Sequence, residues 1–77
     1  MIYRLPRAVY TEADWRYVES DDLETKAWKA GFLHAYRGLD AGWIDKDTQF
    51  MYDLGRQDGE AERDRTIARG ERDPRDW

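Results

Sequence analysis

Five small residues, spaced three or four positions apart in two groups, constrain the fold of this chain more than any other feature. Gly31, Ala35 and Gly38 form the first group, and Gly55 and Gly59 form the second. This spacing places each group on one face of a helix. A glycine inside a helix costs about 1 kcal/mol relative to alanine, and close packing of two helices recovers that cost. The pattern therefore predicts two helices that cross at these residues. The larger side chains predicted to flank the crossing are Phe32, Tyr36, Phe50, Met51 and Leu54.

Helix start and stop signals predict the bounds of three helices. Thr11 followed by an acid three residues later is an N-cap signal. The segment Asp21–Glu24 repeats that signal, and Gly38 supplies a left-handed C-cap. Asp45 or Asp47 caps the last helix. The predicted helices span residues 12–18, 22–37 and 46–69.

These elements predict an all-α fold, with a short N-terminal helix plus an antiparallel helical hairpin packed through small residues. Most of the apolar side chains precede residue 56, so we expect the core there. A chain of 77 residues has room for one domain. We expect a single helical domain over residues 1–70 and a flexible charged tail over residues 71–77. The alternative to close packing is that Gly59 breaks the third helix.

No pattern in the sequence indicates catalysis or metal binding. His34 is the only histidine, and no nucleophile stands near it in a recognisable motif, so it is expected to be a packed or surface residue. There is no cysteine. The aspartates within Asp45–Asp53 suggest a calcium loop, but Phe50 occupies its glycine position and Arg56 its glutamate position. We therefore expect no enzymatic activity, no cofactor and no metal.

The acidic residues indicate a binding surface. The chain has a net charge of -4, and four carboxylates fall within six residues between Glu19 and Glu24. A second acidic group follows the predicted turn. Such surfaces meet basic grooves and steer association, although acidic composition alone also serves solubility. Trp43, between these acids, is expected to be partly exposed and to anchor a partner. The predicted partner-binding residues are Trp43, Asp40, Asp45, Asp47, Asp21, Asp22 and Glu24.

The third helix and the tail interleave arginines with acids. Pairs of opposite charge three residues apart favour a solvated helix that pairs with itself. Arginine also forms bidentate contacts with phosphate, which leaves RNA binding as an alternative. The RNA-binding candidates are Arg37, Arg56, Arg63, Arg65 and Arg69.

Two stretches are similar to known proteins. Ala27–Gly38 (AWKAGFLHAYRG) followed by Tyr52–Gly59 (YDLGRQDG) resembles the ribosome modulation factor family. The resemblance implies a helical hairpin that binds ribosomal RNA and silences ribosomes. This chain is acidic where that family is basic. In size and charge the chain also resembles small phage anti-CRISPR and host-takeover proteins, which occlude nucleic-acid sites.

Two hypotheses about function follow. The first is a non-enzymatic phage-type inhibitor that binds a basic surface of a protein or ribonucleoprotein complex. The second is a ribosome- or RNA-associated modulator that contacts RNA directly. Both place the protein in the cytoplasm of a bacterial or phage-infected cell, without a membrane, since no apolar run approaches the roughly 20 residues that a span requires.

Overall fold

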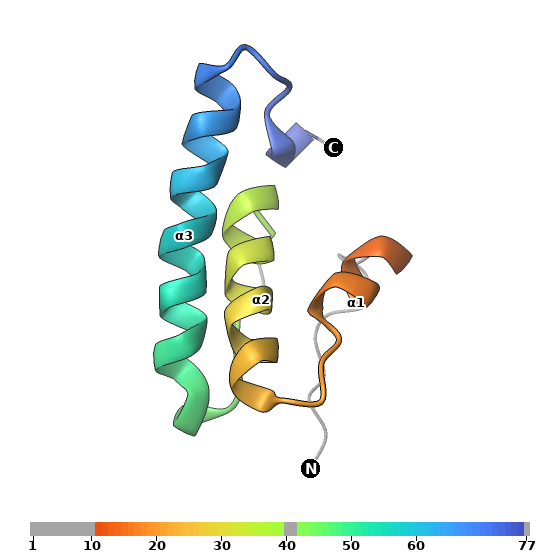
Figure 1. Ribbon diagram of the computed structural model, residues 1–77, viewed down its shortest axis with the longest axis vertical. Helices are drawn as coiled ribbons and strands as arrows, with labels where there is room; N and C mark the ends of the chain where they lie inside the picture. Colours follow the sequence, from red (N-terminus) through yellow and green to blue (C-terminus); the bar gives the residue numbers. More distant parts are fainter. Residues whose placement is uncertain (1–10, 40–41, 77) are drawn as a thin grey trace.

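The computed structural model describes residues 11–39 and 42–76, and the regular structure within them is entirely helical (Figure 1). The predicted all-α fold is confirmed. The three α-helices begin and end within a few residues of their predicted bounds, and the start of the last is a 3₁₀ turn. The elements are α1 (Glu12–Val18), α2 (Leu23–Arg37), η2 (Lys46–Thr48), α3 (Gln49–Ala68) and η3 (Pro74–Asp76).

The caps of α1 and α2 follow the sequence signals. At the last helix, η2 begins after Asp45 and α3 after Thr48, and neither side chain forms a cap bond, so the predicted aspartate cap is wrong. Thr11 Oγ1 accepts a hydrogen bond from the Asp14 N–H at 3.2 Å, and the Asp14 carboxylate accepts one from the Thr11 N–H at 2.9 Å. This reciprocal pair satisfies two N–H groups that α1 leaves without helical partners. The carboxylate of Asp22 accepts from the Thr25 N–H at the start of α2. Gly38 ends α2 with φ 69°, a conformation that favours glycine.

Glycines let α2 and α3 approach until their backbones touch. A methyl group at Gly31 would lie 2.9 Å from the carbonyl carbon of Tyr52. A methyl group at Gly55 would lie 2.9 Å from the carbonyl carbon of Trp28. Gly59 fits against α2 in the same way and lies inside an unbroken α3. The predicted close crossing is therefore confirmed.

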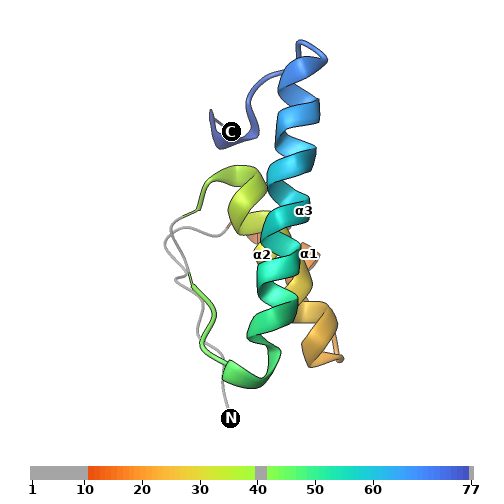
Figure 2. The ribbon, with the colours of Figure 1, turned by 90° about the vertical axis from the view of Figure 1, so that its left-hand side faces the viewer.

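The direction of the two helices differs from the expected antiparallel arrangement. Trp28 Nε1 donates to the Asp58 carboxylate at 3.1 Å, and the hydroxyls of Tyr36 and Thr66 are 3.1 Å apart, so contacting partners advance together along both helices. Figures 1 and 2 show α2 and α3 both rising from their first residues. The segment over 39–48 returns the chain to the starting end. Its roughly ten residues reach about 33 Å when extended, more than the roughly 22 Å length of α2.

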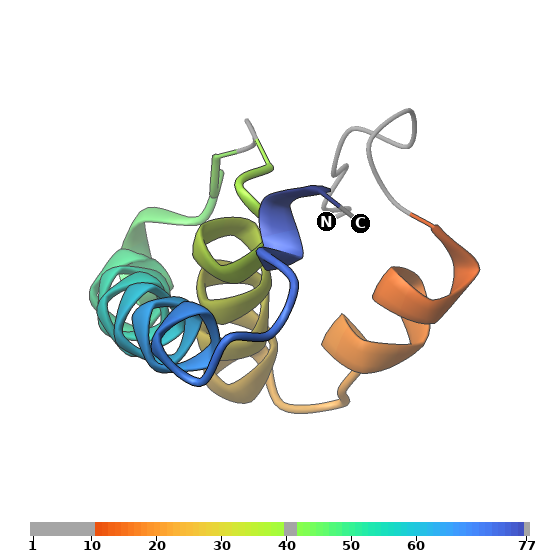
Figure 3. The same cartoon turned by 90° about the horizontal axis from the view of Figure 1, so that it is seen from above.

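The core lies where α2 meets α3 and α1. His34 is fully buried, and its Nδ1 lies 2.7 Å from the Tyr52 hydroxyl. α1 lies on the side of α2 away from α3 (Figure 3) and contributes Val18, with Trp15 packed beside it. The buried apolar cluster consists of Val18, Ala27, Ala30, Leu33, Trp43 and Tyr52.

Residues 71–76 fold back onto the end of α2 instead of extending as the expected tail. Pro74 is buried, and the Arg75 side chain packs over Gly38, where an added methyl group would lie 2.7 Å from the Arg75 Cγ. Arg75 donates to both carboxylate oxygens of Asp73. The helical domain therefore continues past residue 70.

We predict that the Asp73 carboxyl titrates far below its ordinary range. Hydrogen bonds from the side chain and N–H of Arg75 lower the pKa of Asp73 to about 2. Because this folded value lies below the unfolded value of about 3.9, the contact stabilises the folded chain fully above that pH and is lost as pH falls toward 2. An NMR titration of the Asp73 carboxyl should show this pKa, and Arg75→Gln should raise it. A wild-type pKa close to 4 would contradict the contact.

Candidate protein-binding site

The two acidic groups lie at the same end of the molecule. An antiparallel hairpin would have separated them at opposite ends, but α2 and α3 start together at the lower end of Figure 1. Asp21, Asp22 and Glu24 are exposed where α2 begins. Asp47 is exposed and Asp45 half-buried where η2 begins. Asp40 falls outside the described residues. We call Asp21, Asp22, Glu24, Asp45 and Asp47 the acidic end.

Hydrogen bonds fix two of these carboxylates. Asp22 accepts from the Thr25 hydroxyl at 2.6 Å and from its N–H at 3.2 Å, and these bonds lower the pKa of Asp22. Asp45 accepts from the Thr48 hydroxyl at 2.6 Å. Among the described residues, no hydrogen bond or ion pair engages the carboxylates of the other three members, which are Asp21, Glu24 and Asp47. Three carboxylates are thus directed to solvent.

Trp43 is a core residue, and the prediction that it is partly exposed is wrong. Its side chain is 9% exposed, and its ring stacks on Tyr52 with centroids 5.9 Å apart. Trp43 Nε1 donates to the Thr48 hydroxyl at 2.7 Å. The cause is the returning segment before α3, which brings Trp43 against the helix pair. A partner cannot use this buried ring as its apolar anchor.

Exposed apolar side chains near the acidic end were missed by the sequence analysis. Ile44 is 58% exposed, Phe50 55% and Leu54 47%. Phe50 and Leu54 were predicted to flank the crossing, and this prediction is wrong. With about 100° per residue, Leu54 points about 100° and Phe50 about 140° away from the buried Gly55. Because Gly55 faces α2, its position in the sequence could have been used to predict that both side chains point away from α2.

Three of the five arginines proposed for RNA binding contact other groups of the chain. Arg37 forms an ion pair with Asp14, and the two side chains are 13% and 7% exposed. Arg63 donates to the carbonyl oxygen of Ala35 at 2.7 Å, which ties α3 to α2. The guanidinium of Arg56 lies 5.9 Å from the centroid of the Tyr52 ring. These three groups are engaged within the chain.

The other two arginines are exposed but paired with neighbouring acids. Arg65 donates to the Glu62 carboxylate at 2.9 Å and 3.0 Å. Arg69 donates to Glu71 at 2.8 Å. A phosphate would have to compete with these carboxylates for both guanidinium groups.

His34 has the packing role that we predicted. It is fully buried, and its ring meets the edge of the Tyr52 ring at a centroid distance of 5.5 Å. Burial raises the pKa of the Tyr52 hydroxyl. Across residues 11–39 and 42–76, no three histidine, aspartate or glutamate side chains come together to hold a metal ion. Over the same residues, no helix has the length and apolar character needed to cross a bilayer.

Comparison with known proteins identifies no relative: no family model, curated protein or solved structure matches the chain. The resemblance to the ribosome modulation factor family therefore stays a prediction. The function has to be argued from the acidic end, the exposed apolar residues beside it and the arrangement of the arginines.

Proposed function

We propose that this protein is a non-enzymatic binding protein that inhibits or modulates a nucleic-acid-handling complex by covering one of its basic surfaces. The observation that carries the proposal is that both acidic groups lie at one end, because α2 and α3 start there together. Three of its carboxylates, those of Asp21, Glu24 and Asp47, extend into solvent. A phage-type inhibitor such as an anti-CRISPR protein is the class that this arrangement fits.

Charge at the acidic end supplies attraction and orientation. Complementary potentials raise association rates and fix the register of a complex more than they raise affinity. Affinity needs desolvated apolar contact, and Phe50 and Leu54 offer it four residues apart on the exposed side of α3. Phe50 follows Asp47 by one helical turn, so charge and apolar surface are adjacent. These residues take the anchoring role first assigned to Trp43.

The alternative is a ribosome- or RNA-associated modulator of the ribosome modulation factor type. It is supported by the two glycine–aromatic stretches and by the exposed Arg65 and Arg69. The remaining arginine candidates argue against this alternative, because they already bond to other groups of the chain. They are Arg37, Arg56 and Arg63.

We predict that reversing three charges at the acidic end abolishes partner capture. The triple variant Asp21→Lys, Glu24→Lys and Asp47→Lys places cations where the partner's own cations must dock, and like charges at an interface cost several kcal/mol. Asp22 is left intact because it caps α2. The measurement is a pull-down from bacterial lysate with and without nuclease, with helix content checked by circular dichroism.

The matched control reverses a charge elsewhere on the same molecule. Asp64→Lys changes an exposed acid in the second half of α3 and should leave capture intact. Capture that survives the triple variant would contradict the proposal. Loss of capture on nuclease treatment, together with release by Arg65→Glu and Arg69→Glu, would establish the RNA-type alternative.

We predict that Phe50→Ala weakens partner binding without changing stability. Truncating a hot-spot aromatic costs about 2 kcal/mol or more, which is roughly a 30-fold weaker complex. The free energy of unfolding should change by less than about 0.5 kcal/mol, since an exposed side chain leaves no cavity. Titration calorimetry against the captured partner and urea unfolding separate the two quantities. Unchanged affinity would show that Phe50 lies outside the interface.

A further inference from the structure

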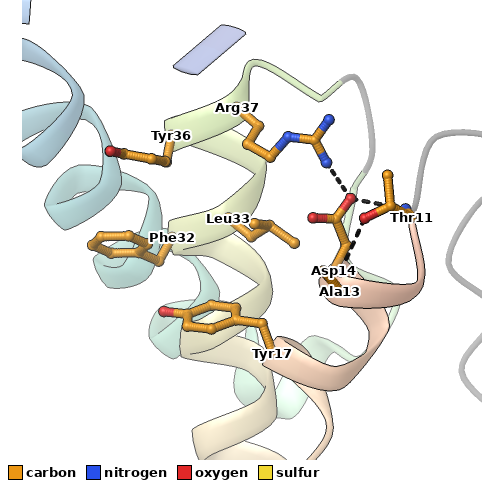
Figure 4. A pocket seen from close by; sticks show the side chains of 8 residues that line it. All are labelled: Thr11, Ala13, Asp14, Tyr17, Phe32, Leu33, Tyr36 and Arg37. Atoms are coloured by element: carbon orange, nitrogen blue, oxygen red, sulfur yellow. Dashed lines mark hydrogen bonds and ion pairs between the residues drawn. The ribbon is translucent and has the colours of Figure 1, made fainter. Parts of the chain in front are cut away.

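A cleft of about 460 Å³ lies between α1 and α2 (Figure 4). The aromatic rings of Tyr17, Phe32 and Tyr36 line it, and Leu33 lines it on the side that faces α1. Figure 4 shows the Asp14–Arg37 ion pair at one end of this cleft. Clefts of roughly 300–1,000 Å³ with apolar walls and a few polar groups are typical of small-molecule sites.

The rings give the cleft a shape suited to a flat molecule. Phe32 and Tyr36 are near-parallel, with an interplanar angle of 21° and centroids 5.7 Å apart, so they form one continuous wall. Tyr17 on α1 lies 6.3 Å from Phe32, tilted by 46°. Aromatic groups pack best in offset or tilted arrangements at these separations. A planar aromatic ring entering the cleft would therefore find favourable ring contacts with both helices.

Positive charge at the cleft indicates an anionic or acceptor group on the ligand. The Lys29 ammonium lies 5.9 Å from the centroid of the Tyr17 ring. The Arg37 guanidinium bonds to Asp14, but its Nε is buried and has no hydrogen-bond partner among the described residues. A buried donor without an acceptor is costly, and such a donor indicates a missing partner nearby. Lys29 lies beside the cleft at Tyr17, about 12 Å along α2 from Arg37, so Asp14 does not balance its charge.

We propose that the cleft between α1 and α2 binds a small planar aromatic anion. The aromatic body lies against Tyr17, Phe32 and Tyr36, and the anionic group is directed toward Lys29 beside Tyr17, at the end of the cleft away from the Asp14–Arg37 ion pair. This site shares no residue with the acidic end and takes a ligand of the opposite charge to its partner. It is therefore an additional binding activity, separate from the proposed docking function.

The probe for this site is anilinonaphthalene sulfonate, an aromatic anion with a flat naphthalene ring that fluoresces in apolar surroundings. The full-length chain should bind one equivalent, with NMR amide shifts confined to α1 and the facing part of α2. Phenylnaphthylamine, the same ring system without the sulfonate, should bind at least about tenfold more weakly, because it lacks a charge-assisted contact. Equal binding of the neutral compound would overturn the anion assignment.

Substitutions locate the probe. Ala13→Trp fills the cleft from the exposed side of α1 and should abolish binding. Tyr17→Ala removes one ring and should weaken binding about tenfold. Phe50→Ala, on an exposed apolar surface outside the cleft, is the matched control and should leave binding unchanged. Unchanged binding in Ala13→Trp and Tyr17→Ala, or loss of binding in Phe50→Ala, would overturn the proposal.

Discussion

Gly55→Ala will cost about 3 kcal/mol or more of the free energy of unfolding, although it adds only a methyl group. On an isolated helix the same change would stabilise by about 1 kcal/mol. Here the methyl group would lie 2.9 Å from the carbonyl carbon of Trp28 and 2.9 Å from the amide nitrogen of Phe32. Overpacking a core costs about 1–3 kcal/mol when side chains can move, and these obstructing atoms are backbone. The helices must separate to accommodate the methyl group.

Urea unfolding followed by circular dichroism measures this effect, and another glycine provides the control. Gly42 has nothing within 4 Å of an added methyl group, so Gly42→Ala should change stability by less than about 0.5 kcal/mol. A neutral or stabilising Gly55→Ala would show that α2 and α3 do not touch at this residue.

Breaking the ion pair between Arg37 and Asp14 is expected to destabilise the chain by about 3–5 kcal/mol. Both side chains are largely buried, at 13% and 7% exposure. Arg37→Leu leaves the Asp14 carboxylate buried without its cation, and among the described residues only Thr11 then donates to it. A seven-residue helix is marginal in water, so α1 depends on such contacts with α2. We expect a lower thermal midpoint and loss of α1 amide protection from hydrogen exchange.

An exposed ion pair on α1 provides the control for this prediction. Arg16 and Glu12 pair at 2.6 Å, but both side chains are 79% exposed, so Arg16→Ala should cost less than about 0.5 kcal/mol. The double variant Asp14→Asn with Arg37→Leu should cost less than the sum of the single changes, because it leaves no unpaired charge. Additive costs, or an Arg37→Leu effect as small as that of Arg16→Ala, would contradict a structural role for the pair.

Local sequence signals predicted where the helices lie. The relative direction of α2 and α3 depends on long-range packing and could not be predicted from those signals. Thr11, Asp22 and Gly38 cap their helices through contacts within a few residues, so their roles were visible in the sequence. The small residues predicted which faces meet. A stripe of glycines is compatible with either helix direction, however, and the returning segment is long enough for both. The direction therefore required the structure.

The candidate site depended on that direction. The acids could be identified from the sequence, but their gathering at one end follows from the shared start of α2 and α3. Trp43 is buried because the segment that returns the chain to the start of α3 brings its ring onto Tyr52. The exposure of Phe50 and Leu54 was open to prediction, because their angular separation from Gly55 already pointed them away from α2.

The common direction of α2 and α3 also affects how the chain folds. Contacts between α2 and α3 join residues well separated in the sequence, from 18 positions for His34 and Tyr52 to 30 positions for Tyr36 and Thr66. Two antiparallel helices joined by a tight turn can form their first contacts beside the turn, between residues close in the sequence. Because α2 and α3 run in the same direction, they have no such short-range contacts. Every one of these contacts closes a loop of many residues, and the entropic cost of closure changes only slowly with loop length. The two helices therefore dock without a local starting point, and a chain emerging during synthesis cannot secure α2 until the returning segment and the first turns of α3 have been made.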